Sequence, residues 1–65
     1  MNDSKESIKH SIESSEGMLH KRCEQLRDLI FMDEDYSPDE VIQIASDIKL
    51  LSDIIISQSG KLQRS

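Results

Sequence analysis

The sequence predicts an all-α protein, an antiparallel helical hairpin that dimerises into a four-helix bundle. Two stretches, residues 4–32 and 38–59, repeat apolar residues at helical spacing. The connection between them is short, and short connections join antiparallel neighbours. Hydrophobic residues make up 35% of the 65 residues, and a single cysteine allows no disulfide framework. So small a core indicates that association with a second copy or another protein completes it. We expect one domain.

The first expected helix covers about residues 4–32 and begins with a capping box formed by Asp3 and Glu6. Its apolar residues recur at intervals of three, four or seven: Ile8, Ile12, Leu19, Cys23, Leu26 and Ile30. Cys23 is interpreted as a small core residue. The stripe lacks a member around Ser14–Gly17, and Gly17 lowers helix propensity by about 1 kcal/mol relative to Ala. A break near residues 15–17 therefore stays open.

The connection and the start of the second helix carry strong local signals. Acidic residues at positions 33–35 oppose the dipole at the end of the first helix. Ser37 is a good N-cap, and Pro38 suits the first helical position. Glu40 completes a capping box with Ser37. The sequence therefore predicts that the second helix begins at Pro38.

The second expected helix runs to about residue 59, and residues 60–65 form a tail after Gly60. Its expected core stripe consists of Val41, Ile44, Ala45, Ile48, Leu51 and Ile55. Further apolar residues lie off that stripe: Ile42, Leu50, Ile54 and Ile56. A helix packed on one neighbour does not need so wide an apolar face. This excess predicts a second contact surface, in a homodimer or against a partner.

Charge and composition narrow the function classes. The net charge is −5, and residues 33–59 carry seven acids against Lys49 alone. Such a balance disfavours nucleic acid and anionic membranes, because both need clustered Lys and Arg. The polar N-terminus, the lone Cys23 and the short apolar runs favour a cytoplasmic protein without a membrane span. We expect no cofactor.

Metal sites are not supported by the sequence. Acidic and hydroxyl residues alternate through positions 33–39 as in a calcium loop, but Pro38 stands where that loop needs Gly and Ile44 where it needs Glu. His20 and Cys23 are three apart on a helix, yet two ligands make no zinc site. No oxyanion hole or pocket for Cys/His catalysis is indicated.

Three stretches together resemble a known family: a Leu26-Arg27 pair in the first helix, a capped start at residues 37–42 and the stretch 41–51 of the second helix. They are similar to the small aspartyl-phosphate phosphatases of sporulating bacilli, two-helix proteins that dephosphorylate a sporulation response regulator. The resemblance covers about residues 23–56. It implies a helical hairpin that binds a response regulator through its second helix.

The signature of that family, Ser-Gln-x-Leu-Asp, is altered here. Ala45 stands for the Ser, Ser46 for the Gln and Ile48 for the Leu, while Lys49 replaces the catalytic Asp. As catalytic candidates we take Asp47 and Ser46, which would position water in line with an acyl phosphate. The candidate partner-binding residues are Gln43, Ile42, Leu50, Asp53, Ile54 and Arg27.

Two other functions stay open at this stage. One is a non-catalytic homodimeric helical adaptor or inhibitor whose apolar surface caps a partner helix. The other is an RNA-binding hairpin, for which the first helix offers a basic strip of Lys5, Lys9, Lys21, Arg22 and Arg27. The net charge disfavours it.

Overall fold

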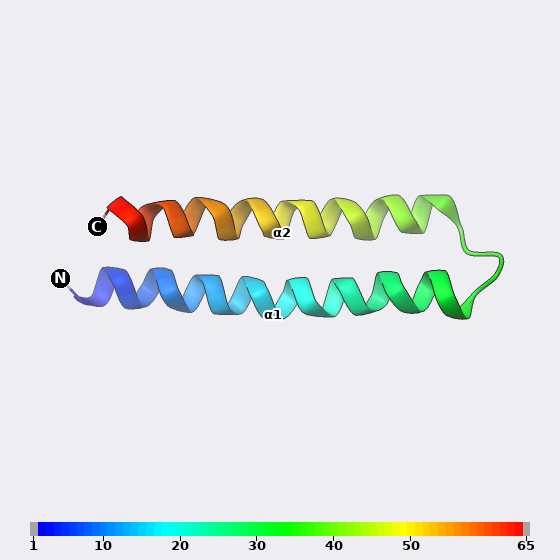
Figure 1. The fold of residues 1–65 in the computed structure, drawn as a ribbon, viewed down its shortest axis with the longest axis horizontal. Helices are drawn as coiled ribbons and strands as arrows, with labels where there is room; N and C mark the ends of the chain where they lie inside the picture. The colour runs from blue at the N-terminus through cyan, green and yellow to red at the C-terminus, as the bar shows by residue number, and fades with distance from the viewer. Residues whose placement is uncertain (1, 65) are drawn as a thin grey trace.

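The structure, a computed structural model, describes residues 2–64, with side-chain burial for residues 5–64. Helix α1 spans Asn2–Met32 and helix α2 spans Pro38–Arg64. The two helices lie side by side in opposite directions, so that both chain ends lie at the same end of the molecule (Figure 1). The rod measures 51 × 14 × 12 Å. The predicted antiparallel helical hairpin is therefore confirmed.

The loop between the helices is held by backbone amides. The N–H of Asp35 donates a hydrogen bond to a carboxylate oxygen of Asp33 at 3.1 Å, an Asx turn. The amides of Glu40 and Val41 donate to the carbonyl of Ser37 at 3.1 and 3.2 Å. Helix α2 thus begins at Pro38, as predicted. The cap differs in one detail, because the Glu40 amide bonds to the carbonyl of Ser37 and not to its hydroxyl.

Both helices are more continuous than the sequence suggested. Helix α1 passes through residues 15–17 without a break, and α2 continues through Gly60 to Arg64. Gly60 does not have a positive φ, so it does not act as a C-cap. Leu62 lies seven residues after Ile55 and is also half-buried, so the longer helix extends the apolar stripe. The predicted cap at Asp3 involves a side chain outside those described.

The two helices meet along one seam of buried and half-buried side chains. In α1 the seam consists of Ile8, Ile12, Ser15, Leu19, Arg22, Leu26 and Leu29. In α2 it consists of Val41, Ile44, Ile48, Leu51, Ile55, Gln58 and Leu62. Both series alternate steps of three and four residues. This is the 3.5-residue repeat of a coiled coil, in which each helix keeps the same stripe toward its neighbour.

Three residues that the sequence assigned to the core lie outside this seam. Cys23 and Ala45 are exposed, and Ile30 is 41% exposed. Each stands one residue after a seam position. The error arose because the prediction left the polar residues Ser15 and Arg22 out of the stripe, and the stripe then drifted by one residue. The buried Ser15 and half-buried Arg22 keep the seven-residue repeat.

The core along the seam is thin. Leu51, which is 8% exposed, is the only buried apolar side chain among residues 5–64. The accessible surface is 5341 Å² for a chain of 7.5 kDa. A compact protein of this mass exposes about 4,200 Å², so the hairpin exposes about 1,100 Å² more. Two helices in a single layer leave that surface uncovered.

Gly17 tests whether the continuous α1 helix contributes to stability. An added Cβ at Gly17 meets no atom within 4 Å. We expect Gly17→Ala to raise the free energy of unfolding by about 1 kcal/mol, because Ala has the higher helix propensity and the site has room for its methyl group. Urea titration followed by circular dichroism measures the change. An unchanged or lower stability would contradict a continuous helix at this position.

Candidate functional site

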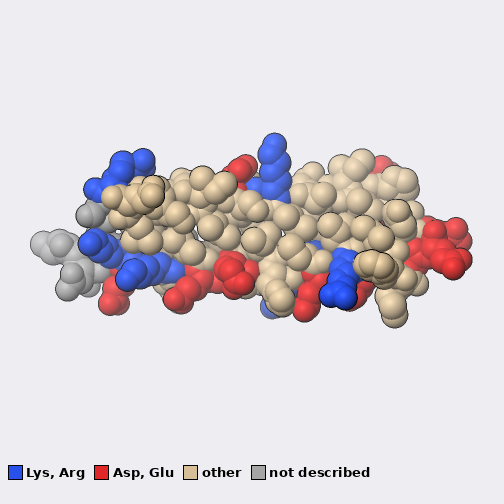
Figure 2. Space-filling model, in the orientation of Figure 1, with Lys and Arg blue, Asp and Glu red and all other residues tan. Residues whose placement is uncertain are grey.

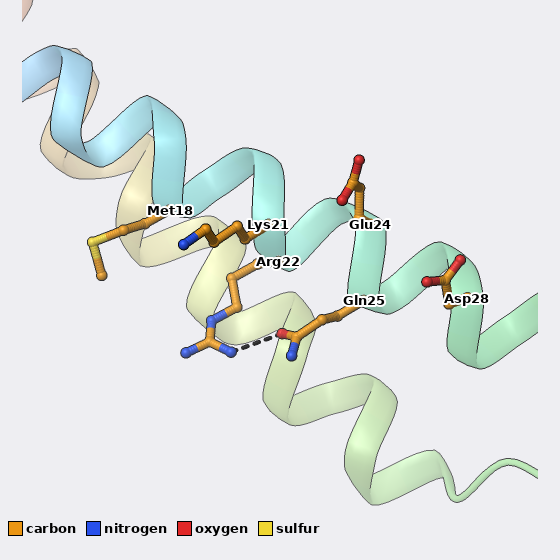
Figure 3. Close-up of a pocket in the computed structure, with 6 residues that line it drawn as sticks. All are labelled: Met18, Lys21, Arg22, Glu24, Gln25 and Asp28. Atoms are coloured by element: carbon orange, nitrogen blue, oxygen red, sulfur yellow. Dashed lines mark hydrogen bonds between the residues drawn. The ribbon is translucent and has the colours of Figure 1, made fainter.

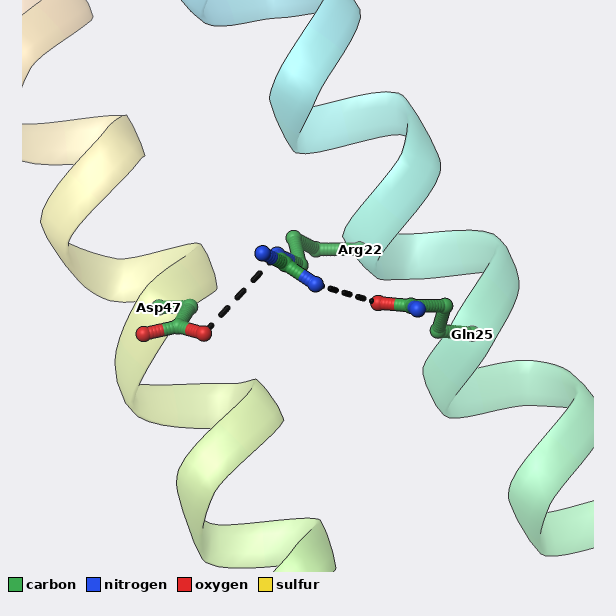
Figure 4. A network of polar contacts seen from close by, with 3 residues as sticks. All are labelled: Arg22, Gln25 and Asp47. Atoms are coloured by element: carbon green, nitrogen blue, oxygen red, sulfur yellow. Dashed lines mark hydrogen bonds and ion pairs between the residues drawn. The ribbon is translucent and has the colours of Figure 1, made fainter.

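One polar network joins the two helices near the middle of the seam. The Nε of Arg22 lies 3.8 Å from a carboxylate oxygen of Asp47, and the Arg22 guanidinium donates a hydrogen bond to the Gln25 side-chain oxygen at 2.7 Å (Figure 4). The Arg22 and Asp47 side chains are 42% and 38% exposed. Arg22 therefore takes a seam position while its charged group stays in contact with water.

This network determines the orientation of the predicted catalytic residues. The Asp47 carboxylate is directed toward α1 and is half-buried, whereas Ser46 is exposed. Adjacent residues are about 100° apart around a helix, so the two side chains face different directions. Asp47 and Ser46 therefore do not present a shared pair of polar groups on one surface.

The network also identifies one side of the hairpin, which we call the Arg22 flank. It consists of Met18, Arg22 and Gln25 on α1 and of Asp47, Leu50 and Ile54 on α2. Steps of three and four residues place the members of each set on one helix face, and the ion pair joins the two faces. Figure 3 shows a shallow groove along the α1 part of this flank, lined by Met18, Lys21, Arg22, Glu24, Gln25 and Asp28.

The predicted partner-binding residues are divided between different sides of the molecule. Leu50 and Ile54 lie on the Arg22 flank, where Leu50 is 62% exposed and Ile54 is half-buried. Ile42 is 63% exposed and lies on the opposite flank of α2, which we define by Ile42, Lys49 and Ile56, each seven residues apart. The others, Gln43, Asp53 and Arg27, are exposed.

The most exposed apolar side chains gather at the loop end of the hairpin. We define the loop-end surface as Ile30, Phe31, Met32, Tyr36 and Ile42, which are five of the eight large exposed apolar residues of the described chain. Phe31 is 79% exposed and Met32 is 84% exposed. These two also line a groove with Glu24, Arg27 and Asp28. Grouped exposed apolar side chains of this kind mark interaction sites.

Acidic residues lie next to the loop-end surface, in and just after the loop. Five exposed acids with no base among them lie between residues 33 and 40: Asp33, Glu34, Asp35, Asp39 and Glu40. Figure 2 shows a cluster of acidic side chains at that end of the rod and others along its length, while much of the surface over α2 is uncharged. The loop end thus combines apolar contact area with a concentrated negative field.

Sequence reasoning missed two features of these surfaces. It gave no surface role to Phe31, which lies two residues after the seam residue Leu29 and so faces outward. It also treated Arg22 as a surface base. The seven-residue series Ile8, Ser15, Arg22 and Leu29 was the available signal for both assignments.

Among the described residues, no group of three His, Cys, Asp or Glu side chains is placed to hold a metal ion. The Nε2 of His20 instead lies 3.2 Å from the Oε1 of Glu24, one helical turn away. Arg27 and Asp28 are exposed. Neither described helix combines the length and the apolar character that crossing a membrane requires.

Comparison with known proteins gives no relative for this chain. No protein-family model, no curated protein sequence and no solved structure matches it.

Replacing Arg22 tests the role of the polar network. We expect Arg22→Leu to raise the thermal midpoint, because an exposed ion pair contributes about 0–1 kcal/mol, whereas an apolar side chain at a seam position adds buried area. Asp47 remains accessible to water after the change. Arg22→Ala serves as the control that removes the pair without adding apolar area. A lower midpoint for Arg22→Leu than for wild type would show that the ion pair stabilises the fold by more free energy than the buried leucine side chain adds.

Proposed function

We propose that this hairpin is a small regulatory protein that acts by binding another protein through its loop-end surface, without catalysing a reaction. The observation that carries the proposal is the exposure of Phe31 and Met32, at 79% and 84%, next to the five exposed acids of residues 33–40. Large apolar side chains supply most of the energy in protein interfaces, and a polar rim surrounds them. The partner is expected to offer an apolar groove with basic residues at its edge.

The resemblance to response-regulator phosphatases names one class of partner. A response regulator is therefore the first candidate for binding. Catalysis is a weaker interpretation, since Lys49 replaces the family's catalytic Asp and Asp47 is oriented toward Arg22. Under this proposal the hairpin controls its partner by occupying a surface, as an inhibitor or adaptor does.

Phe31→Asp tests the binding surface. Receiver domains of response regulators from the same organism, immobilised one at a time, are titrated with the hairpin by biolayer interferometry. We expect at least one to bind, and Phe31→Asp to weaken that binding tenfold or more, because the change removes an apolar anchor from the interface. Ile56→Asp is the matched control, since Ile56 is 68% exposed but distant from the loop along α2. Equal losses for both variants would contradict the loop-end assignment.

The same complex tests the absence of catalysis. The bound receiver domain is phosphorylated with acetyl phosphate, and loss of the phosphoryl group is followed with wild-type hairpin and with Asp47→Asn. We expect equal rates, because the Asp47 carboxylate is directed to Arg22. Faster loss with wild type that Asp47→Asn abolishes would overturn the proposal and establish a phosphatase.

A further inference from the structure

We propose that two copies of this chain associate side by side and antiparallel through the Arg22 flank, with Leu50 and Met18 at the centre of the contact. This interface uses residues other than the loop-end surface, so the proposal goes beyond the proposed function and does not depend on it.

The first observation is the position of the uncovered apolar side chains. Met18 is 52% exposed, and Leu50 is 62% exposed on the same flank. Both lie near mid-length of their helices, since α1 spans Asn2–Met32 and α2 spans Pro38–Arg64. A two-fold axis through mid-length places Met18 and Leu50 of one copy against the same residues of the other copy. This is the self-complementary contact of a symmetric dimer.

The second observation is the amount of surface available. The hairpin exposes about 1,100 Å² beyond a compact protein of its mass. A standard interface buries about 800 Å² on each partner. Packing a second hairpin along the 51 Å rod would therefore bury most of the excess surface. The result is a four-helix bundle, in which the thin seam becomes part of a larger core.

Charge selects the antiparallel arrangement. The acids at residues 33–40 lie at one end of the rod, and parallel copies would place both acidic loops together. Antiparallel copies separate them by up to the 51 Å length of the rod, far beyond the Debye length of about 8 Å in physiological salt. The same arrangement brings two oppositely charged residues together. Glu40 and Lys61 lie ten and eleven residues from Leu50, so Glu40 of one copy approaches Lys61 of the other.

Charge also selects the Arg22 flank over the opposite one. On the opposite flank Lys49 lies midway between Ile42 and Ile56, seven residues from each. A two-fold axis there would bring the two Lys49 ammonium groups together, and like charges facing each other oppose association. On the Arg22 flank the midpoint is Leu50, and the nearby charge of Asp47 is already paired with Arg22.

Light scattering after size exclusion tests the interface. We expect wild-type protein at 100 μM to have twice the 7.5 kDa mass of the chain, and Leu50→Asp to have the monomer mass. Ile56→Asp is the matched control, because Ile56 has similar exposure, 68% against 62%, on the same helix. It should remain dimeric. Far-ultraviolet circular dichroism shows whether each variant keeps its helices. Leu50→Gln replaces Leu50→Asp if that variant unfolds.

Two outcomes would overturn the proposal. One is a wild-type protein that stays monomeric up to 1 mM. The other is a dimer that Ile56→Asp dissociates and Leu50→Asp does not, which would assign the contact to the opposite flank.

Electron–electron distance measurement tests the orientation. A spin label is placed at Asp35→Cys in a Cys23→Ser background, since Cys23 is the single native cysteine and is exposed. Antiparallel copies should give a label separation close to the 51 Å rod length. A separation below half that length would establish a parallel dimer and contradict the assignment by charge.

Discussion

A two-helix hairpin has only one interior surface, the seam where its helices meet, and this constraint governs the rest of the structure. Each helix can bury one stripe against its neighbour, and any apolar residue off the stripe stays in water. The seam of this chain follows a 3.5-residue repeat over the length of both helices. Within it Leu51, at 8% exposed, is the only buried apolar side chain among residues 5–64.

The polar members of the seam influence specificity more than stability. Arg22 occupies a core position and pairs with Asp47 across the helices, at an exposure where ion pairs contribute little free energy. A polar residue at a core position can still fix the register of a coiled coil, because a shifted pairing would leave it against an apolar residue. Ser15 is the small polar residue at another seam position, where its side chain is buried.

The architecture was predictable because its signals are local. Helical periodicity, the Ser37-Pro38 start and the acidic connection each determine nearby backbone, and together they predict the hairpin. The identity of the exposed residues was less predictable. Cys23, Ile30 and Ala45 were assigned to the core because an idealised apolar stripe excludes Arg22. Whether a long charged side chain lies along a seam depends on its partner on the other helix, here Asp47, which a pattern within one helix does not contain.

The central claim is that the apolar side chains left outside the seam are association surfaces, so that folding and association are linked. The most direct measurement is the thermal unfolding midpoint, followed by circular dichroism at protein concentrations that differ a hundredfold. A protein stabilised by association melts at a higher temperature when it is more concentrated, by mass action. We expect the midpoint to rise with concentration. A midpoint that does not change would show that the single hairpin seam supplies all of the stability.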